Sequence, residues 1–342
     1  MAEVVAEVVR IPRSPATNGA SLSRSIMRHL FLFFTGLLAL VPAVLAEDSI
    51  VFNQRYKSGN RYHQTITTEQ QIDMDLGVKK TQQEMVMSLG MLAEVTDSET
   101  EFGKRVKVSY DSATISQTVD GQKFAFDSKS PDAANSGPLA AFGGIIGREF
   151  TIVFDKEDNV REVENFEATM QKLAAGNPAS AALYTQLFNK NTMKHMLEQS
   201  ALRSPPGKPV LKGNAWDFSN ELEMPGIGKL VVRGYYTYQG MVEQGGKRLA
   251  KVDAKADIQV ETGKDEGNKA GNLINQMNMK IEEGHMEGTL LYDTEINFTR
   301  DVQISQTITL TAVIPDGSRR TIRLPMKQKV HMVLDDFGPL KK

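Results

Sequence analysis

Alternation of apolar and polar residues near the C-terminus is the feature that most constrains how this chain can fold. From Met286 to Phe298 the even-numbered positions are mostly apolar or small, and the odd-numbered positions are mostly polar. A period of two residues is typical of a strand with one buried and one solvated face. The same parity continues to Leu310, which is too far for one strand. We therefore expect a turn at 293–295 or 299–301, and an antiparallel meander.

Other segments predict strands joined by short turns. Pro315–Ser318 is turn-forming, and Ile322–Leu334 carries the apolar positions of a returning strand. Apolar parity changes between Tyr110 and Ala113, as it does at a β-bulge. Tight hairpins are expected at Asp120–Gly121, Lys156–Asn159 and Gly245–Gly246. The predicted fold class is mainly β (α+β), with long antiparallel meanders forming a curved sheet or sheets.

The middle of the chain predicts helix instead. Phe166, Met170 and Leu173 have helical spacing, and Asn177–Pro178 resembles a helix N-terminus followed by Leu183–Leu197. We expect these helices to cover or brace a sheet. The predicted organisation is a β-rich half at 47–164, a helical segment at 165–203 and a second β-rich half at 204–342.

Leu30–Ala46 indicates the compartment. Basic residues precede this apolar run, and a small-residue exit follows it, as in a secretory signal peptide at 27–46. Residues 1–26 are then a disordered extension or a start-site artefact, with Met27 the true start. The alternative is a retained N-terminal membrane anchor, because the run is of borderline length for a span. In the anchored case the chain contacts the membrane only through this segment.

Charge and cysteine content exclude several classes of function. Of 40 basic and 42 acidic residues, four and two precede position 47, so 36 and 40 remain after cleavage there. This balance gives no basis for nucleic-acid binding. The chain has no cysteine, which rules out disulfides, thiolate metal sites and a cysteine nucleophile. A secreted chain held together without disulfides favours a bacterial envelope protein.

Two short matches leave open an internal duplication. Gly59–Tyr62 reappears in similar form as Gly213–Trp216, and Gly103–Val106 as Gly246–Leu249, in the same order. Each half would then be a β-meander that opens with an aromatic residue after Gly-Asn. The other interpretation is that Gly-Asn and Gly-Lys are common turn sequences.

Carboxylates are the candidates for catalysis. Asp73 and Asp75 share one strand face, and Asp155 and Glu157 lie in a polar turn whose spacing resembles a calcium loop without its glycine and its last glutamate. The preferred interpretation is a solvated strand face and a hairpin turn. The alternative is an exported hydrolase in which two of these carboxylates meet in one concave site.

The remaining candidates have mainly structural interpretations. His195 and Glu198 lie three residues apart on a predicted helix, where a surface position is favoured over a metal site. The other candidates stand singly and indicate no site. They are the scattered histidines His63, His285 and His331, the core residue Trp216, the glycosylation sequon at Asn297 and the glycine-rich connector Phe142–Gly147. No catalytic residue is assigned, and no cofactor or metal is expected.

The Gly59–Tyr62 opening, the Gly147–Val163 hairpin and the Gly213–Trp216 restart resemble a family of secreted bacterial proteins of unknown function. The resemblance covers most of residues 50–300. It implies an envelope location and no catalytic residues. A fainter similarity is to periplasmic lipoprotein-carrier folds, in which a curved sheet and covering helices enclose a lipid-binding cavity. These observations predict a non-catalytic exported β-scaffold that binds a lipid, another apolar ligand or an envelope protein.

Overall fold

The computed structural model describes part of the compact unit formed by Glu47–Lys342. The ranges described are 49–75, 80–96, 103–133, 137–166, 168–169, 171, 202, 208–224, 228–261, 280–313 and 321–340. The predicted leader, the turn at Pro315–Ser318, His195 and Glu198 therefore lie outside the described residues. Within them, no helix is long and apolar enough to cross a membrane.

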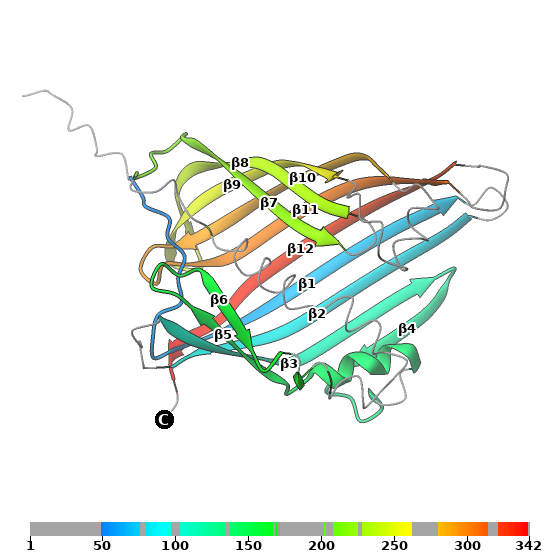
Figure 1. The fold of residues 1–342 in the computed structure, drawn as a ribbon, viewed down its shortest axis with the longest axis horizontal. Coiled ribbons are helices and arrows are strands. Elements are labelled where there is room, and N and C mark those ends of the chain that lie inside the picture. Colours follow the sequence, from blue (N-terminus) through cyan, green and yellow to red (C-terminus); the bar gives the residue numbers. More distant parts are fainter. Residues whose placement is uncertain are drawn as a thin grey trace, which may run out of the picture. The chain divides into compact units, whose positions relative to one another are not determined.

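Twelve strands form one curved antiparallel sheet (Figure 1). The first half of the chain contributes β1 (Asn60–Asp75), β2 (Lys80–Val95), β3 (Lys104–Val119), β4 (Gln122–Asp127), β5 (Glu149–Phe154) and β6 (Val160–Glu164). The second half contributes β7 (Ala215–Met224), β8 (Gly228–Gln244), β9 (Lys247–Glu261), β10 (Lys280–Asp293), β11 (Phe298–Val313) and β12 (Thr321–Pro339). This confirms the mainly β class.

The first and the last strand meet in the middle of the sheet. The strand order is β6-β5-β3-β2-β1-β12-β11-β10-β9-β8-β7, with β4 paired to β3 beside this path. The β1–β12 pair runs from Asn60 opposite Pro339 to Ile72 opposite Met326. The second half is thus a meander of sequential neighbours, and so is the first half except that β5 pairs with β3 and not with β4. One antiparallel contact joins the two halves.

The turns predicted from the sequence are found where the structure describes them. The meander turns between Asp293 and Phe298, where the Asp293 carboxylate accepts from the N–H groups of Glu295 at 2.9 Å and Ile296 at 3.4 Å. Asp120 and Gly121, both at positive φ, close the β3–β4 hairpin. The parity change in β3 is a register shift at Asp111.

The two halves carry their matching motifs at equivalent places. Gly59 and Gly213 precede the first strand of each half, and both have positive φ. Gly103 and Gly246 precede the third strand of each half, β3 and β9, again with positive φ. The matches therefore coincide with equivalent turns, which is where a duplicated meander would keep them.

The expected central helical segment is not supported by the described residues. Its described start is a single turn, in which the Thr169 N–H donates to the Asn165 carbonyl at 3.0 Å. Most of 165–203 lies outside the description. A helix is instead found at Gly137–Ile145, as the 3₁₀ helix η2. It includes much of the predicted glycine-rich connector, and Gly147 N–H bonds to the Tyr110 carbonyl at 2.8 Å, so this stretch is anchored to β3.

Strand register sorts the side chains onto two chemically different faces. One face, here called the apolar face, continues across all the long strands. Its central members are Ile66, Thr68, Gln70 and Ile72 of β1, Met85, Met87 and Leu89 of β2, Ile304, Gln306 and Ile308 of β11, and Met326, Gln328, Val330 and Met332 of β12. The opposite, polar face carries the intervening charged and hydroxyl side chains.

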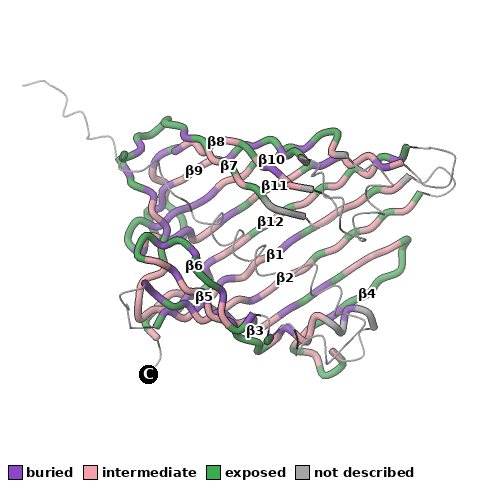
Figure 2. Tube along the Cα trace, viewed as in Figure 1, coloured by how far each residue is buried: buried purple, intermediate pink, exposed green. Residues whose placement is uncertain are grey.

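An irregular N-terminal segment seals one end of the apolar face. Phe52 stacks on Trp216 with ring centroids 5.3 Å apart, and it meets Tyr238 and Tyr292 edge-on. Tyr56 packs on Tyr62, on the other side of the β1–β12 junction. Figure 2 shows that buried stretches concentrate toward this end of the sheet. The core is therefore built at one end, where this segment covers the strands.

An ion pair stabilises the turn between β10 and β11. The Arg300 Nε donates to Asp293 Oδ2 at 2.6 Å, and the Asp293 side chain is only 3% exposed. We expect Asp293→Ala to lower the free energy of unfolding by about 2–4 kcal/mol, since it leaves buried donors without an acceptor. Urea unfolding measures this. Asp257→Ala, at a side chain that is 69% exposed, is the control and should change stability by less than about 0.5 kcal/mol. Equal losses of unfolding free energy in the two variants would contradict the stabilising role given to the Asp293–Arg300 ion pair.

Buried tyrosines predict a loss of stability at high pH. Burial raises the pKa of Tyr62, Tyr110 and Tyr236 from 10.0 to about 12. Because the folded pKa is the higher one, this stabilisation is complete below pH 10 and is lost as the pH rises towards 12. Near-ultraviolet circular dichroism and tyrosinate absorbance should therefore change together above pH 10. Full ionisation of these tyrosines near pH 10 in a protein that remains folded would contradict this expectation.

Candidate functional site

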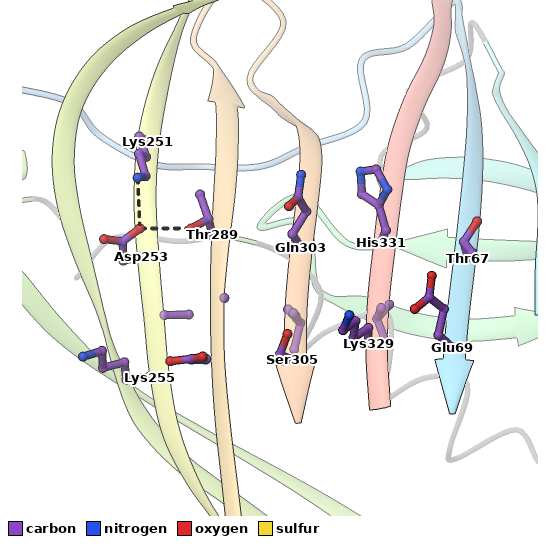
Figure 3. Close-up of a pocket in the computed structure, with 15 residues that line it drawn as sticks. Thr67, Glu69, Lys251, Asp253, Lys255, Thr289, Gln303, Ser305, Lys329 and His331 are labelled. Carbon is purple, nitrogen blue, oxygen red and sulfur yellow. Dashed lines mark hydrogen bonds and ion pairs between the residues drawn. The ribbon is translucent and has the colours of Figure 1, made fainter. Parts of the chain in front are cut away.

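The polar face carries a half-open pocket of about 670 Å³ (Figure 3). Five adjacent strands, β9, β10, β11, β12 and β1, supply its lining. Lys251 lies 3.8 Å from Asp253, which also accepts from the Thr289 hydroxyl at 3.1 Å. The lining alternates positive, negative and hydroxyl side chains. Such an arrangement is what a solvated sheet face presents.

One register row crosses this pocket. Lys255 is opposite Glu287, which is opposite Ser305, which in turn is opposite Lys329 and then Glu69. Lysine and glutamate therefore balance along the row. The pocket has no excess of either sign that would select a charged ligand.

The carboxylates suggested for catalysis lie in two separate places, the end of β1 and the β5–β6 turn. Asp73 is exposed on β1 opposite Gln82. Asp75 is the last residue of β1, opposite Lys80. Asp155 accepts from the N–H groups of Glu157 and Asn159 at 3.0 and 2.8 Å, so it organises the β5–β6 turn.

The strand register keeps these two groups apart. Phe154 is opposite Lys104, and this end of β3 aligns with the start of β1. Asp73 is thirteen positions further along β1, or on the order of 40 Å at about 3.3 Å per residue. The described positions therefore place Asp73 and Asp155 in no common site.

A histidine held between two aspartates was not found from the sequence. His63 Nε2 lies 2.9 Å from an Asp111 oxygen, and His63 Nδ1 lies 3.2 Å from an Asp335 oxygen. Thr65 also donates to Asp335, at 2.5 Å. Both aspartates stand at register shifts, Asp111 in β3 and Asp335 in β12. Two β-bulges therefore turn these side chains towards His63.

This cluster links the two halves of the sheet and leaves no ring nitrogen open. Gly90 makes room for it, because a Cβ there would lie 2.3 Å from Asp111 Oδ1. Both His63 nitrogens face carboxylates, so neither is directed at a substrate or a metal. Among the described residues, no group of three or more acidic or histidine side chains is arranged to hold a metal ion. The cluster is best explained as a structural tie across β12, β1, β2 and β3.

The other described candidates are also structural. His285 pairs with Asp257 at 2.9 Å and His331 with Asp301 at 3.2 Å, both on the polar face. Trp216 is 8% exposed in β7 and packs on Phe52, which confirms it as a core residue. Asn297 lies in the β10–β11 turn at positive φ.

The apolar face differs from the polar face in lacking charge in its middle. There the side chains of β1, β2, β11 and β12 are aliphatic, methionine, threonine or glutamine. A charged side chain does lie on this face towards the sealed end, where Lys104 of β3 pairs with Asp158. Its middle is only half-buried at Ile66, Ile72, Met326 and Val330. None of these four belongs to the described clusters of buried core residues. An uncharged, partly exposed apolar patch therefore lies in the centre of the sheet.

Comparisons with solved structures give distant likenesses. A lipovitellin structure has a TM-score of 0.47 and 6% identity, and it matches 84% of this chain. This chain spans only 26% of that one. DynF, from the dynemicin biosynthesis pathway of Micromonospora chersina, has a TM-score of 0.22 and 6% identity, with 86% of this chain and 87% of that chain covered. These values support no functional argument.

A domain described as an outer membrane lipoprotein-sorting protein, from Vibrio parahaemolyticus, is also similar. Its TM-score is 0.14 at 6% identity, with 81% of this chain and 87% of that chain covered. No curated protein matches the sequence.

The sequence itself identifies the family. The expected resemblance to a family of unknown function is confirmed by a family model that matches residues 103–299, from the turn before β3 into the first residues of β11. The match covers more than half of the chain and spans the β5–β6 hairpin and the Gly213–Trp216 restart. The chain belongs to DUF6263, a family of unknown function.

Proposed function

We propose that this protein is an exported, non-catalytic β-scaffold of the bacterial cell envelope that binds an apolar ligand on the apolar face of its sheet. The observation that carries the proposal is the uncharged, half-buried patch around Ile66, Ile72, Met326 and Val330. A contiguous, partly exposed apolar patch of this kind often marks a binding site on a protein surface.

The position of the patch supports a ligand site. The described core residues pack at the sealed end, where Phe52 and Tyr56 cover the strands, and under η2, where Ile115 and Leu139 are buried. The patch lies on β1 and β12, in the middle of the strand order. A sheet that needed this face only for its own core would be expected to bury its centre first.

The side chains of the patch suit an apolar guest. Met85 and Met87 of β2 and Met326 and Met332 of β12 lie on the two strands that flank β1. Methionine is flexible and polarisable, so it adapts to guests of different shape. Because the middle of this face presents no charge, a ligand held there should contact it mainly through hydrocarbon, as an acyl chain does.

A substitution on this face should weaken binding. Met326→Gln keeps the size of the side chain and adds a polar amide, so it should weaken the binding of Nile red, an uncharged apolar dye, by about 5- to 30-fold, or about 1–2 kcal/mol. Lys327→Gln, the neighbouring residue on the polar face, receives the same side chain and should leave binding unchanged. Fluorescence titration of the two full-length variants measures both.

A second matched pair of variants tests whether weaker binding reflects a loss of folded protein. Val330→Asn on the apolar face and Lys329→Asn on the polar face should behave in the same way, with melting temperatures as the check. Equal binding by both members of both pairs would show that the apolar face is not the site. Native mass spectrometry of protein purified from its own envelope should also find a co-purifying apolar molecule.

Export is supported by the leader at 27–46. We expect protein purified from its native host to begin at Glu47, because cleavage after Ala46 removes the apolar run. N-terminal sequencing checks this. A chain that retains Leu30–Ala46 would instead support the anchored alternative, in which the sheet is attached to a membrane.

A further inference from the structure

Three glutamines form a register row across the middle of the apolar face. Gln70 of β1 is opposite Gln328 of β12, and Gln328 is opposite Gln306 of β11. Met85 flanks the row on β2 and Met286 flanks it on β10. Polar amides thus occupy three adjacent strands at one level of a face that is mostly apolar.

The hydrogen-bonding capacity of these amides is mostly unused. All three residues are half-buried. The Gln70 Nε2 donates to the Met326 sulfur at 3.0 Å, and a thioether is a weak acceptor. Within the described part of the chain, no hydrogen bond joins the side-chain amides of Gln306 and Gln328 to another group. Each amide therefore offers two donors and one acceptor that a ligand lying on this face can reach.

The surroundings of the row define the kind of group that would satisfy it. The neighbours on the same face are Thr68 and Val330 on one side, and Ile308, Met326 and Ile72 on the other. None of them is charged. Solubility alone does not account for the glutamines, since the polar face meets that need with lysine and glutamate. Neutral donors and acceptors at one level match an uncharged carbonyl-bearing group, not a carboxylate or an amine.

We infer that this glutamine row recognises the uncharged ester or amide group of an amphiphilic ligand whose hydrocarbon lies on the apolar patch. The inference rests on the proposed function and specifies its ligand class as neutral, acyl-ester or acyl-amide lipids. The row fixes the position of the polar group along the strands, and the flanking methionines contact the adjoining hydrocarbon.

The test compares three probes with the same number of non-hydrogen atoms: decane, methyl heptanoate and octanoate. Their dissociation constants are obtained by competition with Nile red on the full-length protein. The decisive quantity is the ratio of the constants for the ester and the hydrocarbon. In the double variant Gln306→Met, Gln328→Met, this ratio should shift about tenfold against the ester, as expected for losing one net hydrogen bond. Octanoate should bind the wild type more weakly than the ester.

Gln303→Met is the matched control, because Gln303 lies on the same strand β11 but on the polar face. It should leave the ratio unchanged. The single variants Gln306→Met and Gln328→Met replace the double variant if that protein fails to fold. A ratio that shifts no more than in Gln303→Met would overturn the inference, and so would tighter binding of octanoate than of the ester. Decane binding would persist in both cases, whereas failure of decane to bind the wild type would refute the proposed function itself.

Discussion

The antiparallel contact between β1 and β12 is the constraint on which the rest of the structure depends. It joins the first and the last strand over thirteen register positions and turns two separate meanders into one sheet. Because side chains alternate between the faces, a slip of one residue at this junction would place Ile66 and Met332 on opposite faces of the sheet. Between His63 and Gln64 the register shifts, because Asp335 is an extra residue in β12. The alternation of faces therefore continues before and after this shift.

One consequence is the chemical separation of the two faces. The polar face carries balanced charge and a shallow pocket, whereas the middle of the apolar face carries no charge. Aromatic residues around Phe52 and Tyr56 close one end of the apolar face, and its centre is left half-buried. The glutamine row lies in that centre, which is why both the proposed ligand and its polar group are assigned to the same surface.

The strand and turn predictions were correct wherever chemistry is local. The turn after Asp293, the bulge in β3 and the Asp120–Gly121 hairpin follow from alternation and turn-forming residues within a few positions. The prediction that Phe142–Gly147 is only a glycine-rich connector was wrong. Much of it belongs to a 3₁₀ helix, which depends on contacts with β3. The histidine cluster and the glutamine row could not be predicted from the sequence. His63, Asp111 and Asp335 are distant in sequence, and Gln70, Gln306 and Gln328 appear as ordinary polar residues until their strands are aligned.

The sequence by itself determined the parity of each strand, the positions of the hairpins and the absence of charge from alternate positions. These properties arise within one strand or turn, where backbone geometry and residue preference act directly. Only the tertiary structure decided that the halves share one sheet, that β1 lies against β12, and that three glutamines meet in one row. Strand pairing depends on contacts between residues more than two hundred positions apart, and no local pattern specifies which strands will meet.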